Sequence, residues 1–131
     1  MIEKFRSDAL FSYLLEKCSL TATQIDTVLA KGQNEKSKKR TLFRMKHHVS
    51  SGAFLRSLRQ AQSNIEASIY TLLLLEYLHL VDTAKLTQLV RISGLIQEVG
   101  ELASEPRDIG QLIAVMGEFV GLFSGRRKVI S

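Results

Sequence analysis

Cysteine and proline are almost absent from this chain, with one residue of each in 131, and tryptophan is missing. The single cysteine, Cys18, excludes an internal disulfide and a zinc site built from several thiolates. Hydrophobic residues make up 45% of the chain and charged residues 24%, which excludes a disordered or collagen-like chain. At this length we expect one cooperative domain over residues 1–131 that buries a core of its own.

Long uncharged hydrophobic runs are also missing. The longest apolar stretch, residues 69–81, contains Glu76 and His79 and is shorter than the roughly 20 residues that span a bilayer. Residues 1–13 mix charged and apolar side chains, unlike a secretory signal. The sequence therefore predicts a cytoplasmic protein without a membrane partner, and it predicts that residues 69–81 lie in a helix buried on nearly all sides.

Acidic side chains are scarce in one part of the chain. Residues 31–60 contain nine lysines and arginines against the single acid Glu35, which gives +8, whereas residues 61–125 contain three bases and eight acids, which gives −5. Solubility alone does not require this segregation. A surface that binds a polyanion does, because each neutralised phosphate releases counterions and adds affinity.

The apolar residues that are present recur at helical spacing. Positions three and four apart predict amphipathic helices, and together they predict an all-α, compact domain of five to six helices. The expected helices cover residues 2–17, a short segment ending before Gly32, residues 51–81, 82–102 and 107–123.

Several residues are candidates for helix ends. Thr21 or Thr23 can cap the second helix, Gly32 fits its left-handed C-cap, and a loop is expected over residues 32–35. Asp82 can cap the fourth helix, and the proline at position 106 is tolerated in the first turn of the last one. Ser63 and Asn64 favour non-helical hydrogen bonding, so residues 51–81 form either one bent helix or two abutting helices.

Residues 36–46 fit two structures. Their few large apolar residues are compatible with a basic helix or with a β-wing, and we favour the helix. Residues 47–50 form a break, and Ser50 is an effective N-cap for the helix that starts near Ser51.

The segment around this break carries a recognisable order of residues. Val49 precedes the cap Ser50, Phe54 follows five positions after Val49, and Arg56 comes shortly afterwards. This order resembles the turn and recognition helix of helix-turn-helix DNA-binding proteins of the transcriptional-regulator type. Residues 60–75 are also similar to archaeal regulator-like proteins. The helix-turn-helix resemblance covers about residues 37–64 and implies a first helix near 37–46 followed by a helix that reads the major groove.

The residue types on this second helix suit a duplex. At 3.6 residues per turn Arg56, Arg59, Gln60 and Ser63 share one face. The opposite face carries an apolar stripe made of Phe54, Leu58, Ala61 and Ile65. Arginine can contact guanine edges, glutamine can read adenine, and the helix N-terminus can donate to a phosphate. The remaining cations would position the protein on the backbone. The predicted DNA-binding residues are Lys36, Lys38, Lys39, Arg40, Arg44, Lys46, Ser50, Ser51, Gly52, Arg56, Arg59, Gln60 and Ser63.

No glycine-rich phosphate loop, metal-binding helix motif or nucleophile elbow occurs in the sequence. We therefore expect no enzyme activity, no cofactor, no metal and no small-molecule substrate. Glu76 and His79 are expected to form a buried pair or a dimer contact, and Cys18 a buried small residue.

The hypothesis that joins these observations is a homodimer that binds double-stranded DNA. It would be either a sequence-specific transcriptional regulator or an architectural, nucleoid-associated protein. Residues 1–66 would bind the DNA, and residues 67–125 would form the apolar core and the dimer contact through their two C-terminal helices. The alternative is a helical assembly module whose basic segment binds an acidic partner or RNA. Aromatic residues are only 7% of the chain, which disfavours stacking on single-stranded bases.

Overall fold

The computed structural model describes residues 8–37, 43–44, 47–48, 50–101 and 106–126. These residues form α1 (Ala9–Lys17), α2 (Ala22–Ser37), β1 (Phe43–Arg44), β2 (His47–His48), α3 (Ser51–Tyr77), α4 (Thr83–Glu101) and α5 (Pro106–Phe123). The predicted all-α fold is confirmed, with one two-residue strand pair added to it. The chain divides into two compact units, Met1–Thr71 and Leu72–Ser131. None of the described helices is long and apolar enough to cross a membrane.

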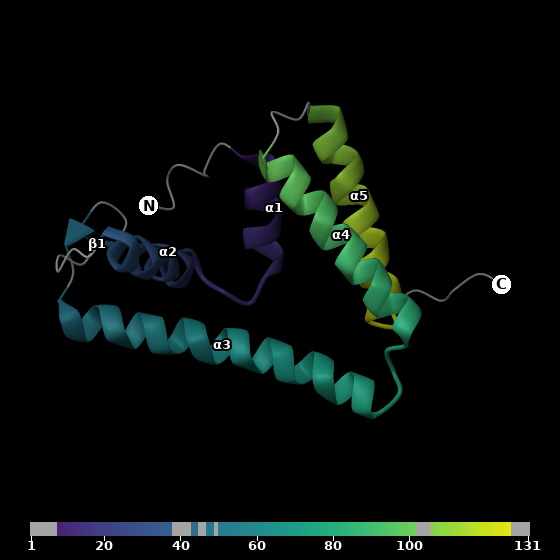
Figure 1. Cartoon of the computed structure of the whole chain (residues 1–131), viewed down its shortest axis with the longest axis horizontal. Helices are drawn as coiled ribbons and strands as arrows, with labels where there is room; N and C mark the ends of the chain where they lie inside the picture. Colours follow the sequence, from purple (N-terminus) through teal and green to yellow (C-terminus); the bar gives the residue numbers. More distant parts are fainter. Residues whose placement is uncertain (1–7, 38–42, 45–46, 49, 102–105, 127–131) are drawn as a thin grey trace. The chain divides into compact units, whose positions relative to one another are not determined.

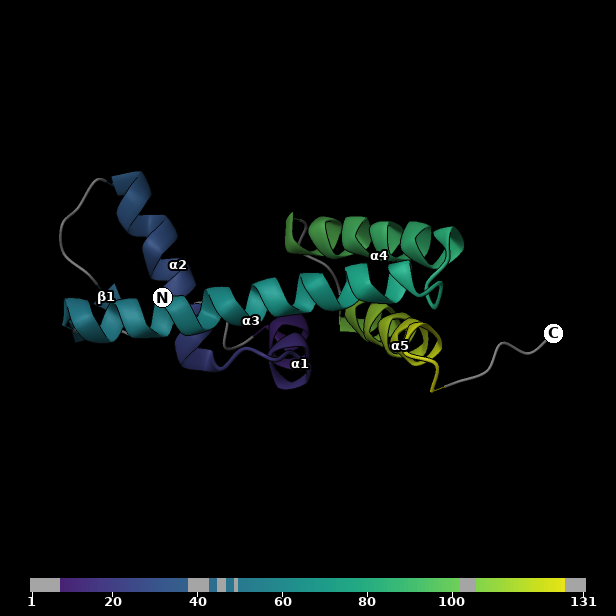
Figure 2. The same cartoon turned by 90° about the horizontal axis from the view of Figure 1, so that it is seen from below.

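The first unit is built around the contact between α2 and α3. In Figures 1 and 2, α2 crosses the first half of α3. Phe54 and Leu58 of α3 pack with Ala30 of α2, and Val28 lies against this cluster. Since Phe54 is 4% exposed and Ala61 is fully buried, the predicted apolar stripe of α3 is confirmed over these residues. Ile65, predicted to continue the stripe, is exposed instead.

The N-terminal ends of α1 and α2 are capped by side chains. Asp8 has an extended backbone, and its Oδ1 accepts hydrogen bonds from the amides of Leu10 and Phe11 at 2.9 and 3.1 Å. The predicted helix over residues 2–17 therefore begins at Ala9, because the cap interrupts it, and residues 2–7 lie outside the described residues. At α2, Thr21 Oγ1 accepts from the Gln24 amide and Gln24 Oε1 accepts from the Thr21 amide, both at 3.1 Å. This reciprocal pair is a capping box, so Thr21 is the cap.

The predicted end of α2 is wrong. Gly32 does not cap the helix, because α2 continues through it to Ser37 and leaves no loop at residues 32–35. A Cβ atom at Gly32 would meet nothing within 4 Å, so neither a close contact nor a turn requires glycine there. Val28 and Ala30 pack on α3 before this position, and α2 also contacts β1, so tertiary contacts support the helix as a whole.

The favoured helix over residues 36–46 is also wrong where the structure describes it. Lys36 belongs to α2, and Phe43 and Arg44 form β1, which pairs antiparallel with β2. The register places Phe43 opposite His48 and Arg44 opposite His47, so an antiparallel strand pair stands where we expected a helix followed by a break. The other alternative, a β-wing, fits this strand pair better. Residues 38–42 and 45–46 lie outside the described residues.

The third helix is one continuous element of 27 residues. The break considered at Ser63 and Asn64 does not occur, because the Asn64 side chain bonds across to the turn between α1 and α2 rather than to its own backbone. The prediction that residues 69–81 are buried is wrong for most of them. Ile69, Tyr70, Leu73 and Leu74 are all more than half exposed.

A left-handed residue ends α3. His79 has φ +59°, its amide donates to Glu76 O at 3.0 Å, and the Leu80 amide donates to Leu75 O at 2.9 Å. These two bonds form a Schellman motif with His79 in the position that glycine usually takes. Glu76 and His79 are both exposed, so the expected buried pair is wrong. Cys18 is likewise exposed.

The second unit rests on the contact between α4 and α5, which run side by side in opposite directions (Figures 1 and 2). Asp82 caps α4 as predicted, since its Oδ1 accepts from the Lys85 amide at 2.9 Å. Proline starts α5, also as predicted. Among the described residues of this unit, the buried hydrophobic ones are Val81, Ile92, Leu112, Met116 and Phe119.

Candidate nucleic-acid interface

Four of the predicted DNA-binding side chains lie together on the first half of α3. Arg56, Arg59, Gln60 and Ser63 are all exposed, and their spacing places them on one face of the helix. At about 100° per residue, the centre of this face lies roughly 180° around the axis from Phe54, Leu58 and Ala61. The contact with α2 therefore turns the arginines outward, and we name these four residues the arginine face.

The arginine face carries no neighbouring acid on its own helix until Glu66. Two long cationic side chains and two hydrogen-bonding side chains thus occupy a stretch of about 10 Å, at 1.5 Å per residue. Such a surface can donate to phosphate oxygens and to acceptors on base edges.

The N-terminus of α3 continues this surface. Ser50 Oγ accepts a hydrogen bond from the Ala53 amide at 3.1 Å, which confirms Ser50 as the N-cap. The amides of the first helical turn have no acceptor inside a helix, so those of Ser51 and Gly52 can donate outward. Both residues are exposed, and a Cβ at Gly52 would meet no protein atom within 4 Å. The protein itself therefore places no steric demand for glycine at this position.

The other predicted site residues are spread over different elements. Lys36 is in the last turn of α2 and Arg44 is in β1. Lys38, Lys39, Arg40 and Lys46 lie outside the described residues. The described part of the chain thus brings together the residues of α3, and it does so without the preceding helix that the helix-turn-helix resemblance implies.

A hydrogen-bond network holds α3 against the turn between α1 and α2. Asn64 Nδ2 donates to Ser19 O at 3.4 Å and to Gln24 Oε1 at 3.2 Å. Gln24 is also half of the capping box of α2, so one amide side chain links α3 to the start of α2. This link fixes α3 one turn beyond Gln60, and with it the direction of the arginine face.

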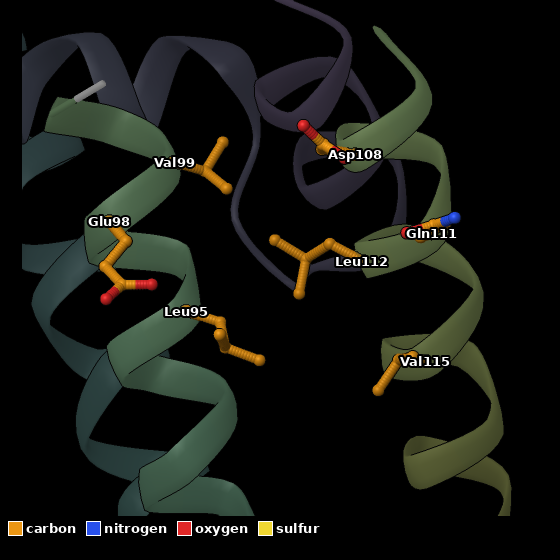
Figure 3. Close-up of a pocket in the computed structure, with 7 residues that line it drawn as sticks. All are labelled: Leu95, Glu98, Val99, Asp108, Gln111, Leu112 and Val115. Carbon is orange, nitrogen blue, oxygen red and sulfur yellow. The ribbon is translucent and has the colours of Figure 1, made fainter. Parts of the chain in front are cut away.

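A groove of about 260 Å³ lies between α4 and α5. Figure 3 shows Leu95 and Val99 of α4 pointing towards α5, and Leu112 of α5 pointing back. Glu98 and Asp108 also line the groove, and both are exposed. This acidic and apolar lining does not suit a polyanion, which leaves the arginine face as the candidate interface among the described residues.

Sequence reasoning missed two features of this region. The Thr21 and Gln24 capping box was readable, because a threonine followed three residues later by glutamine is its signature. The role of Asn64 was not readable, because an asparagine that breaks a helix and one that joins two helices have the same local sequence.

The chain was compared with known proteins in three ways. No protein-family model, no curated protein and no solved structure matches it. The arginine face is therefore the feature from which a function can be inferred.

Proposed function

We propose that this protein binds double-stranded DNA through the first half of α3. The observation that carries the proposal is the exposure of Arg56 and Arg59 on one face, directly opposite the residues that pack on α2. The neighbouring polar residues Gln60 and Ser63 add donors and acceptors to the same face. A major groove about 12 Å wide admits a helix with such a face.

The residues divide into two roles. Arg56 and Arg59 reach base edges or flanking phosphates, and Gln60 can pair with adenine. The capped N-terminus at Ser51 and Gly52 donates backbone N–H groups to a phosphate oxygen, where the helix dipole favours negative charge. A face of about 10 Å covers roughly three base pairs, at 3.4 Å per pair. The excess of positive charge over residues 31–60 adds affinity that does not depend on sequence.

The direct test is a salt titration of binding to mixed genomic duplexes, followed by sequencing of the bound fragments. The variant Arg56→Ala/Arg59→Ala should lose enriched motifs, and its salt slope should fall by about 0.9 for each phosphate that it no longer neutralises. Arg91→Ala is the matched control, because Arg91 is an exposed arginine of α4 outside the arginine face. A double variant that binds with the same slope and the same motifs as Arg91→Ala would contradict the proposal.

Substitution of Gly52 gives a second test, because it should weaken DNA binding without lowering the stability of the fold. A Cβ there meets nothing in the protein, and alanine is the better helix former, so Gly52→Ala should fold at least as stably as the unmodified protein. If the helix N-terminus approaches a phosphate, the added methyl group should weaken DNA binding severalfold. Unchanged affinity in a fully folded Gly52→Ala protein would remove the N-terminus from the interface.

A helical assembly module is the second candidate function. The exposed apolar side chains in the second half of α3 favour an assembly module, since large exposed apolar patches mark interaction surfaces. It predicts no retention of duplex DNA at moderate salt, and binding of an acidic protein partner or RNA by the basic segment. The same salt titration therefore decides between the two functions.

A further inference from the structure

The second half of α3 and Leu78, directly after it, present a set of large hydrophobic residues that the described part of the chain leaves exposed. Ile69, Tyr70, Leu73, Leu74, Tyr77 and Leu78 are between 52% and 79% exposed. We name them the tyrosine-leucine stripe. At 100° per residue they occupy one half of the helix circumference, with Tyr70 and Tyr77 along its centre. Between Glu66 and Glu76 no residue carries a charge.

The order of residue types in the stripe is the same in both directions along the helix, except that Ile69 at one end is matched by Leu78 at the other. Tyr70 and Tyr77 lie at equal distances from the midpoint between Leu73 and Leu74, and so do Ile69 and Leu78. A two-fold axis through this midpoint would pair each tyrosine with the other tyrosine of a second copy. It would also pair Leu73 with Leu74, and Ile69 with Leu78. Such self-complementarity is what an isologous dimer interface requires.

The exposed area of the stripe also fits an interface with a second copy of this chain. At about 200 Å² for a fully exposed side chain of this size, the stripe leaves roughly 700 Å² uncovered on each chain. A standard interface buries about 800 Å² per partner, and its core is enriched in tyrosine and depleted in charge. The stripe therefore provides nearly the whole of one side of such an interface.

Two polar residues flank the stripe, Thr71 on one edge and Glu76 on the other, and the rim of an interface is polar. Thr71 Oγ1 already donates to Ala67 O at 2.8 Å, so its hydroxyl can be covered without losing a hydrogen bond. The faces of α4 and α5 were the sequence-based choice for a dimer contact. They supply Ile92, Leu112, Met116 and Phe119 to the core of their own unit, whereas the stripe stays open.

From the exposure, the symmetry and the area we infer that the stripe binds a second copy of this chain, with the two α3 helices antiparallel. This inference does not rest on DNA binding. A dimer that ignores DNA would leave it intact, and a monomer that binds DNA would overturn it.

The mass in solution is the first test. The full chain should sediment as a dimer at micromolar concentration, and Leu73→Glu should raise the dissociation constant on the order of a hundredfold, because a carboxylate would enter an apolar contact. Val90→Glu is the matched control, since Val90 of α4 is 71% exposed and lies outside the stripe. An unmodified chain that is monomeric, or Leu73→Glu chains that stay dimeric, would overturn the inference. Because Leu73 is exposed, a helical circular dichroism spectrum should be retained in every variant.

The direction of the helices is tested by cross-linking in a Cys18→Ser background. Tyr70→Cys chains mixed with Tyr77→Cys chains should form a disulfide dimer, because the symmetry places these positions opposite each other. Either variant alone should not form it, since seven residues separate the two positions by about 10 Å along the helix. Efficient cross-linking of Tyr70→Cys chains with themselves would establish a parallel pair and contradict the proposed arrangement.

Discussion

Replacing Asn64 tests the link that holds α3 on the turn between α1 and α2. Its Nδ2 donates at 3.2 Å to Gln24 Oε1 and at 3.4 Å to Ser19 O. A typical hydrogen bond contributes about 1 kcal/mol net, and the longer bond contributes less. Alanine regains about 0.5 kcal/mol of helix propensity, so Asn64→Ala should lower the free energy of unfolding by about 1 kcal/mol.

Asn64→Asp should cost more than Asn64→Ala. An aspartate has no donor and would place a carboxylate against two acceptor oxygens, Ser19 O and Gln24 Oε1. We expect a loss of about 2 to 3 kcal/mol, because the two acceptors lose their donor and a repulsion is added.

Urea unfolding followed by far-ultraviolet circular dichroism measures all these variants. Gln62→Ala, an exposed change on the same helix, should alter the stability by less than about 0.5 kcal/mol and serves as the control. Asn64 would not link α3 to the turn between α1 and α2 if Asn64→Asp were as stable as Asn64→Ala, or if Asn64→Ala were no less stable than Gln62→Ala.

Three further substitutions test the described fold by the same unfolding measurement. His79→Gly should raise the free energy of unfolding by up to about 1 kcal/mol, because φ +59° is strained for a side chain with a Cβ; a loss of stability would contradict the Schellman end of α3. Gly32→Ala should stabilise the protein by about 0.5 to 1 kcal/mol, since the new methyl meets nothing; destabilisation would mean that α2 ends at this residue. Phe54→Ala should destabilise it by about 3 to 5 kcal/mol, and a loss below about 1 kcal/mol would place Phe54 outside the core.

The helix starts were largely predictable, whereas the C-terminal end of α2 and the exposed half of α3 were not. Ser50 and Asp82 each accept from an amide three residues away, so the local sequence is sufficient to identify them. Gly32 weakens a helix by about 1 kcal/mol, and the contacts of α2 with α3 and β1 outweigh that cost. A local sequence pattern contains no information about such contacts. The apolar pattern of residues 69–78 predicts burial, but it cannot distinguish burial within one chain from burial between two chains.

The candidate site was predictable to a similar degree. Helical spacing was sufficient to place Arg56, Arg59, Gln60 and Ser63 on one exposed face. The element that precedes α3 was not predictable, because residues 36–46 have a composition that fits both a helix and a β-wing. The resemblance to a helix-turn-helix therefore predicted the position of the cationic helix correctly, whereas the helix that it implies before α3 differs from the strand pair β1 and β2.

The arginine face and the tyrosine-leucine stripe lie on nearly the same side of α3, one in each half of a helix of 27 residues. A two-fold axis that joins two stripes would point the two arginine faces in opposite directions, about 40 Å apart along the paired helices. A dimer of this kind could not lay both faces on a single straight duplex. It would instead cross-bridge two separate DNA segments, and such a protein would loop or compact DNA instead of marking one palindromic operator.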